Sequence, residues 1–165
     1  ANPSAEAIRD TMGKSRKWEM QALKKVLSLK ETLKDAGFKK LIFDTSPGFE
    51  YSSINAIVGS DVVGLVLIIY EPDLCGTEQM IGGLYEILEK PVFLIINKIT
   101  NSALSPGLNE KLENRFDKKV LAGIQCFCEV SGNGGTKIFS IVEPEHPFTN
   151  SMEKLSRDME NFLKA

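Results

Sequence analysis

A chain of 165 residues is long enough to form one domain with its own hydrophobic core. Hydrophobic residues make up 42% of it and charged residues 25%, a composition that excludes a disordered chain. The formal net charge of -2 gives no overall electrostatic reason to bind nucleic acid or an acidic membrane surface.

The distribution of apolar residues and cysteines indicates the compartment. The longest apolar run, from Val62 to Tyr70, is much shorter than a bilayer-spanning helix, and the polar N-terminal stretch lacks the pattern of a signal peptide. The three cysteines have no metal-ligand spacing. These features predict a cytoplasmic protein with reduced thiols.

The first predicted element is an amphipathic helix from Arg16 to Lys34. Its apolar residues recur at roughly helical spacing among lysines, glutamates and glutamines, and we expect them to form a buried stripe; they are Trp18, Leu23, Val26, Leu27 and Leu33. Gly37 stands where a glycine commonly ends a helix.

Strands and helices are predicted to alternate along the rest of the chain. Four apolar runs are typical of buried strands: Leu41–Phe43, Val62–Tyr70, Val92–Ile96 and Ile124–Val130. Helical patterns separate them: Tyr51–Val58, Thr77–Glu89 and Leu108–Leu121. The alternation predicts an α/β fold with an open, mostly parallel, doubly wound sheet and helices on both faces. We expect a single domain, with residues 1–38 as a helical region and residues 39–165 as the sheet, its crossover helices and a C-terminal helix.

The C-terminal part ends in a predicted helix. Met152, Leu155, Met159 and Phe162 lie at helical spacing, and Asn150 followed by Glu153 has the form of a capping box. Before it, the segment Lys137–Val142 is predicted as a short strand.

One segment carries a pattern typical of ligand chemistry. Asp44-Thr45-Ser46-Pro47-Gly48 follows the apolar run Leu41–Phe43, and open α/β sheets place ligand contacts at the carboxyl ends of their strands. A carboxylate there can hold Mg²⁺ through water, and Gly48 would let the backbone approach a phosphate. The alternative is that Asp44 only caps a turn between a strand and a helix.

Three motifs in order resemble those of one family. Asp44-Thr45-Ser46-Pro47-Gly48 resembles the D-T-x-P-G switch segment of the MinD/ParA ATPases and their relatives in the cobyrinic acid diamide synthase (CobQ/CobB) superfamily. Ser60–Val66 resembles the A-D-x-x-x-x-V strand entry of that family, and Ile95-Ile96-Asn97-Lys98 resembles its strand ending in Asn-Lys. The resemblance covers about Lys39 to Ile99 and implies a fold like that of the P-loop NTPases.

The resemblance also implies roles for individual residues in binding Mg-ATP. Asp44 would contact the Mg²⁺ hydration shell, and Gly48 would lie near the γ-phosphate. Asn97 would face the base, Lys98 would pack beside it, and Pro147 would pack against it from the loop before the last helix. In the alternative, Asn97 is a turn residue, Lys98 a solvated charge and Pro147 part of a rigid loop. No catalytic residue is assigned.

The sequence departs from the family in lacking its phosphate-binding loop. Nothing before Asp44 has the form G-x-x-x-x-G-K-S/T, and the triplet Gly13-Lys14-Ser15 has Ile8 where the first glycine should stand. We therefore expect the isolated chain to bind Mg-ATP weakly or not at all. Because the missing strand would leave a sheet edge unpaired, we expect a homo-oligomer such as a dimer, or a partner chain that supplies the phosphate-loop half.

Three functions remain open from the sequence. The first is a MinD/ParA-like ATPase-related domain with a nucleotide-binding or regulatory role. The second is a non-catalytic protein-interaction module on the same fold. The third is part of an ATP-dependent amide-forming enzyme like cobyrinic acid a,c-diamide synthase.

The remaining residues with possible chemistry have simpler interpretations. Cys126 and Cys128 fall in a predicted strand and are expected to be buried, while Cys75 is expected in a loop before a helix. Ser131–Thr136 is predicted as a glycine-rich turn, and Lys118-Lys119 as part of a solvated helix face.

Overall fold

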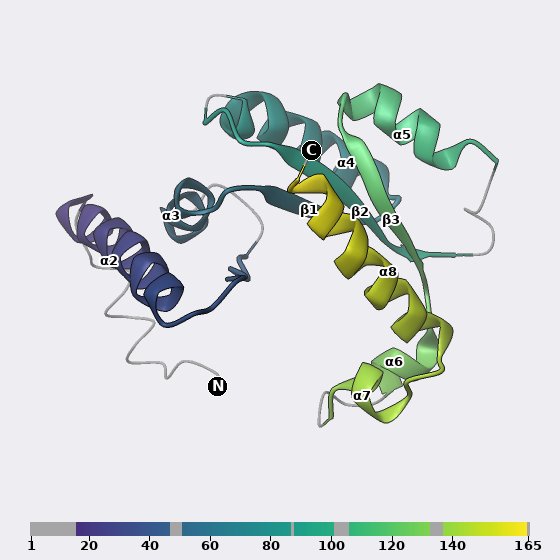
Figure 1. Ribbon diagram of the computed structural model, residues 1–165. Coiled ribbons are helices and arrows are strands. Elements are labelled where there is room, and N and C mark those ends of the chain that lie inside the picture. Colours follow the sequence, from purple (N-terminus) through teal and green to yellow (C-terminus); the bar gives the residue numbers. More distant parts are fainter. Residues whose placement is uncertain (1–15, 47–50, 87, 101–105, 133–136, 165) are drawn as a thin grey trace. The chain divides into compact units, whose positions relative to one another are not determined.

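The computed structural model describes residues 16–46, 51–86, 88–100, 106–132 and 137–164 (Figure 1). The chain divides into two compact units, Ala1–Asp61 and Val62–Ala165. The described residues of the first unit include the helices α2 and α3, and those of the second form a sheet with its helices.

The first unit is built on α2 (Arg16–Asp35), which confirms the predicted N-terminal helix. The helix ends as expected at Gly37, whose φ of 88° lies in the left-handed region that glycine adopts without strain. The N–H groups of Gly37 and Phe38 donate to the carbonyls of Lys34 and Leu33, at 2.9 and 3.0 Å. This arrangement satisfies carbonyls that the end of a helix would otherwise leave without donors.

Another helix of this unit, α3 (Tyr51–Gly59), also confirms a predicted helix. It contacts α2 and buries Ala56 and Ile57. Gly59 permits a close approach, since a Cβ there would lie 2.9 Å from Val26 Cγ1. On α2, Val26 is half-buried as predicted, but Leu27 is exposed, so the buried stripe is narrower than the sequence indicates.

The strand predicted at Leu41–Phe43 does not form. Residues 38–46 have no regular secondary structure, and the Ile42 side chain is 81% exposed. A run of three apolar residues has too little surface to hold a strand without a partner, and no strand within the described ranges pairs with it. Asp44 therefore does not follow a strand.

The second unit contains an open sheet of three parallel strands in the order β1-β2-β3. They are β1 (Val63–Leu67), β2 (Val92–Ile99) and β3 (Lys119–Gln125). Val63 and Leu67 lie opposite Val92 and Ile96, and the pairing of β2 with β3 is interrupted twice by an extra residue. This confirms the predicted α/β class and its parallel pairing.

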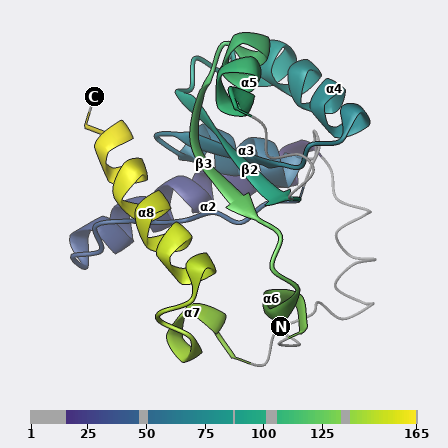
Figure 2. The ribbon, with the colours of Figure 1, turned by 90° about the vertical axis from the view of Figure 1, so that its right-hand side faces the viewer.

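Helices cover both faces of this sheet. Figures 1 and 2 show α8 (Pro147–Phe162) on one side, and α4 (Glu71–Met80) and α5 (Leu108–Phe116) on the other. Phe93 and Ile95 on β2 pack with Ile124 and with Leu155 of α8 in one core cluster. Leu94 and Ile96 are fully buried on the opposite face, as expected for a central strand covered on both sides.

The third strand lies earlier in the chain than predicted. The predicted helix Leu108–Leu121 ends as α5 at Phe116, where Asp117 adopts a φ of 50°. The predicted strand Ile124–Val130 is replaced by β3 from Lys119, and Cys128–Gly132 forms the short helix α6. The Val120 N–H donates to Glu113 Oε1 at 2.8 Å and so anchors the turn into the strand. Lys119 accordingly lies in a strand and not on a helix face.

Two further boundaries differ from the predictions. The helix predicted at Thr77–Glu89 begins six residues earlier as α4 and continues as a π-helical turn, η1 (Ile81–Tyr85). Pro72 in the first turn suits a helix start, because proline lacks the N–H that would have no partner there. The segment predicted as a strand at Lys137–Val142 contains the short helix α7 (Phe139–Val142).

The final helix begins earlier than its predicted capping box. α8 starts at Pro147, with His146 as its N-cap, so Asn150 lies inside the first turn. None of the helices in the described part of the chain has both the length and the apolar content needed to cross a bilayer.

Candidate functional site

Two of the predicted site residues, Asn97 and Lys98, lie near the carboxyl edge of the sheet. Because the strands are parallel, β1, β2 and β3 all end at this edge. The Cys126 N–H, just after β3, donates to the Ile99 carbonyl at the end of β2, at 2.9 Å. In open α/β sheets this is the edge where ligands bind.

Asn97 and Lys98 form a β-bulge near this edge of the central strand. Ile96 pairs with Gly123 and Ile99 with Gln125, so these two residues of β2 oppose only Ile124 of β3. Lys98 adopts a φ of 54°, and its N–H is held by the Asn97 Oδ1 at 2.9 Å. The bulge leaves the Lys98 side chain exposed and Asn97 half-buried.

Pro147 begins α8 in a region that packs near the end of β3. Phe127, two residues after β3, contacts the ring of His146 and that of Phe148 on either side of Pro147. The centroid distances are 5.0 and 6.3 Å. The loop before α8 is therefore attached to the carboxyl end of β3, the strand that neighbours the Asn97–Lys98 bulge.

Asp44 lies in the other unit and lines a shallow cleft of about 390 Å³. Thr45, Ser46 and Phe43 line the same cleft, together with Val26 of α2 and Ala56 of α3. The Ser53 hydroxyl donates to the Ser46 carbonyl at 3.0 Å, which fixes the end of this segment on α3. The Asp44 side chain is exposed. Gly48 lies outside the described residues.

The residues around Asp44 suit only a loose contact with Mg²⁺. No group of three or more histidine, cysteine, aspartate or glutamate side chains within the described ranges could hold a metal ion. One exposed carboxylate with two neighbouring hydroxyl groups can bind the hydration shell of Mg²⁺, which retains several waters in proteins. This donor set fits the water-mediated contact expected of Asp44 and does not amount to a closed metal site.

A cleft of about 600 Å³ opens at the opposite edge of the second unit. Lys119 at the start of β3 lines it, with Lys154 and Phe162 of α8. It contains none of the predicted site residues and lies at the amino end of β3, where open α/β sheets do not usually bind ligands. The carboxyl edge remains the better candidate.

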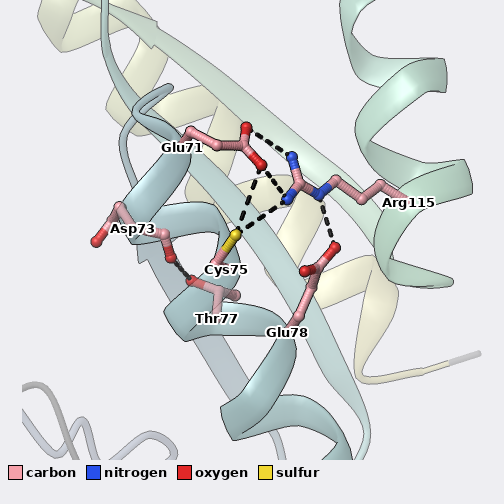
Figure 3. Close-up of polar contacts among 6 residues, drawn as sticks. All are labelled: Glu71, Asp73, Cys75, Thr77, Glu78 and Arg115. Carbon is pink, nitrogen blue, oxygen red and sulfur yellow. Dashed lines mark hydrogen bonds and ion pairs between the residues drawn. The ribbon is translucent and has the colours of Figure 1, made fainter.

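One polar cluster among the described residues of the second unit was not predicted from the sequence. Arg115 of α5 reaches α4, where its two terminal nitrogens contact both carboxylate oxygens of Glu71 at 2.6 and 3.0 Å (Figure 3). Its Nε donates to Glu78 Oε1 at 2.7 Å, and Nη2 lies 3.7 Å from Cys75 Sγ. These partners are 37 to 44 residues apart in the chain, so no local pattern could have indicated them.

The ion pairs of this cluster hold the helices α4 and α5 together. Hydrogen bonding from Arg115 lowers the pKa of Glu71, and the two carboxylates raise the pKa of Arg115 further above its usual value. Because each nitrogen of the guanidinium already donates to a carboxylate, an incoming anion would have to displace one of them. The cluster therefore joins α4 to α5 and is a poor anion site.

The cysteines are more exposed than predicted. Cys75, Cys126 and Cys128 are all free and exposed, so the predicted burial of Cys126 and Cys128 was wrong. Both lie outside a strand, since β3 ends at Gln125. Cys75 lies inside α4 and not in a loop before it, where its thiol contacts Glu71 Oε1 at 3.6 Å.

Comparisons with known proteins add no further assignment. No family model matches the chain, and no curated protein or solved structure matches it significantly. The α/β fold with its open three-stranded parallel sheet is established by the structure itself.

Proposed function

We propose that this chain is a MinD/ParA-like, ATPase-related domain that binds the base of an adenine nucleotide at the carboxyl edge of its sheet. The observation that carries the proposal is the Asn97–Lys98 bulge near the end of the central strand. The phosphates would be bound by a segment that the described residues do not provide, so the role is nucleotide binding or regulation and not hydrolysis by this chain alone.

The bulge supports a ligand site because its backbone conformation is energetically unfavourable. A non-glycine residue with positive φ is uncommon, and such conformations cluster at functional sites, where the surroundings hold them in place. Bulges are also frequent beside active sites, because they redirect a side chain. Lys98 has a positive φ of 54° and lies in a bulge, near the edge that open α/β folds use for ligands.

The side chains at the bulge have the hydrogen-bonding groups that a base requires. The Asn97 carbonyl oxygen accepts the Lys98 N–H, which leaves the side-chain NH₂ group directed away from its own backbone. An adenine ring nitrogen could accept from that NH₂ group. The aliphatic stem of Lys98 and the ring of Pro147 offer apolar surface for the faces of the base.

An NMR titration tests base binding directly. We expect millimolar ADP to shift the Asn97, Lys98 and Phe148 amide resonances, and the Asn97→Ala variant to bind about tenfold more weakly, as for one lost hydrogen bond. Asn109→Ala, which removes the same side chain from the first turn of α5, should bind as the wild type does. Inorganic triphosphate should not reproduce the shifts. If ADP shifts no resonance at this edge, the proposal is wrong.

The magnesium contact expected of Asp44 is tested separately. In calorimetric titrations, any weak binding of Mg²⁺ to the chain should be reduced in Asp44→Ala and retained in Asp35→Ala, which removes an exposed carboxylate at the end of α2. Mg²⁺ binding that is unchanged in Asp44→Ala would remove Asp44 from the proposal and leave the base site untouched.

A non-catalytic interaction module is the second candidate, and one observation favours it. Val66, Ile68 and Tyr70, on and after β1, are 63%, 40% and 60% exposed, and exposed apolar side chains beside an edge strand are typical of a protein contact. This candidate predicts no response to any nucleotide in the same titration.

A further inference from the structure

The only histidine of the chain lies at the centre of a small aromatic cluster in the second unit. The His146 ring packs edge-on against Phe127, which follows β3, and against Phe139 of α7, with both centroid distances at 5.0 Å. Phe148 contacts the same two phenyl rings at 6.3 and 5.9 Å. We call these four residues the His146 cluster: Phe127, Phe139, His146 and Phe148.

His146 is also the N-cap of α8. Its backbone is extended, with φ −69° and ψ 142°, and its Nδ1 accepts a hydrogen bond from the Phe148 N–H at 3.1 Å. The first N–H groups of a helix have no partner within the helix, and Pro147 carries none. The imidazole therefore satisfies the first N–H group that α8 presents.

This cap requires the neutral imidazole. Nδ1 can accept only while it carries no proton, because both nitrogens of a protonated histidine are donors. Protonation would place an N–H group against the Phe148 N–H and add a positive charge at the N-terminus of a helix, where the helix dipole disfavours cations. Histidine changes its charge between about pH 5 and pH 8.

We propose that His146 is a pH-sensitive helix cap, whose protonation opens the first turn of α8 and loosens the His146 cluster. The inference goes beyond the proposed function and does not depend on it. It follows from one contact: a helix of 16 residues is capped by a ring nitrogen that can accept a hydrogen bond only while it carries no proton.

The surroundings of His146 do not reverse the direction of this effect. The imidazole packs against the uncharged rings of Phe127 and Phe139, and its Nδ1 faces the backbone N–H of Phe148. The nearest carboxylates along the chain, Glu143 and Glu145, are exposed, so solvent and salt screen their attraction for an imidazolium. The cap, by contrast, is a direct contact of a half-buried side chain.

The opening is expected to be local. Farther along α8, Leu155 is buried against Phe93, Ile95 and Ile124, and Phe162 packs edge-on against Phe93 at 5.3 Å. These contacts do not involve the cap, so the body of the helix should stay on the sheet when its first turn opens.

The experiment is a comparison of thermal unfolding between about pH 8 and about pH 5.5, the range in which histidine titrates. We expect the Tm of the wild type to fall by roughly 2 to 6 °C over this range, the effect of losing one helix cap in a chain of this size. In His146→Asn the side-chain oxygen can cap without titrating, so its Tm should change little with pH.

A third variant and a resonance measurement exclude a merely structural role. His146→Ala should be destabilised at both pH values, with little pH dependence, while His146→Asn, which loses the ring contacts but keeps a capping oxygen, should be less destabilised than His146→Ala. The Phe148 amide resonance should shift with pH in the wild type and not in His146→Asn. A wild-type Tm that does not change with pH, or an equal fall in His146→Asn, would overturn the proposal.

Discussion

Arg115 illustrates how a single side chain can organise two helices without forming a binding site. Its guanidinium joins Glu71 and Glu78 of α4 to α5, and its side chain is only 27% exposed. A fixed, planar donor group suits such a bidentate contact, and a lysine could not replace it with the same geometry. The strength of the contact should depend on the charge of Glu71, which gives it a defined pH dependence.

We predict that the contribution of Glu71 to stability disappears in acid. Because hydrogen bonding from Arg115 lowers the pKa of Glu71, the folded state favours the ionised carboxylate. The stabilisation is therefore complete above the usual pKa of glutamate and is lost as pH falls through the lowered value in the folded state. In thermal unfolding, Glu71→Gln should lower Tm near neutral pH and match the wild type in strong acid.

Glu110→Gln provides the matched control for this prediction, since it removes an exposed carboxylate from the first turn of α5. Its Tm difference from the wild type should be smaller near neutral pH. A Glu71→Gln difference that stays constant from neutral to acidic pH would contradict the role given to the Arg115 contact.

At the scale of elements, the contact between β1 and β2 depends on a glycine, which has no side chain. A Cβ at Gly64 of β1 would lie 2.8 Å from two ring carbons of Phe93, which is only 1% exposed in the core. Gly64→Ala should therefore lower the free energy of unfolding by about 1–3 kcal/mol, as other overpacked cores do. Denaturant unfolding measures this change.

Gly76→Ala is the control for this prediction, because a Cβ there meets nothing within 4 Å in the helix α4. Replacing a helical glycine by alanine should raise stability by about 0.5–1 kcal/mol. Equal stability of the two variants would show that Phe93 moves aside without cost.

The elements that the sequence predicted well are those with long, unambiguous patterns. The amphipathic stripe of α2 predicts a helix, and the continuous Val, Ile and Leu runs of β1 and β2 predict buried strands. Around β3 the apolar residues run from Val120 to Val130 almost without a break, and periodicity alone could not locate the strand. The end of α5 at Asp117 and the side-chain contact of Glu113 decide it.

The candidate site was predictable only in part. The order of residues placed Asn97 and Lys98 at the end of a buried strand, which the structure bears out. Their bulge depends on the register between β2 and β3, and the packing of the His146 ring depends on Phe127 and Phe139 in other segments. Such features arise from tertiary contacts, which no local pattern encodes.

At the scale of the whole chain, β1 is an edge strand of the sheet that the described residues form. The Val63 N–H donates to Pro91, at the side of β2, so the backbone groups of Gly64 and Val66 point the other way. No strand within the described ranges pairs with them. Parallel sheets are usually covered, and an uncovered apolar edge promotes pairing with another chain.

We predict that the protein associates through this edge and that Val66→Lys weakens the association. Val66 is 63% exposed, and a lysine on an edge strand opposes pairing by charge repulsion and by the cost of removing the ammonium from water. Light scattering over a range of concentrations should show a smaller apparent mass for Val66→Lys than for the wild type.

Ile141→Lys is the control, because it replaces a side chain of α7 that is 73% exposed and lies outside the sheet. It should associate as the wild type does. A wild type that stays monomeric at all concentrations would contradict the prediction.

A small contact beyond β1 limits what can be added at this edge. The Ile68 N–H is already bound by the carboxylate of Asp73 at 2.9 Å, in the first turn of α4. An additional strand could therefore form backbone hydrogen bonds with Gly64 and Val66 but not with the N–H group of Ile68. A polypeptide that pairs with this edge would therefore form few backbone hydrogen bonds. Most of its binding free energy would have to come from side-chain contacts outside the paired residues.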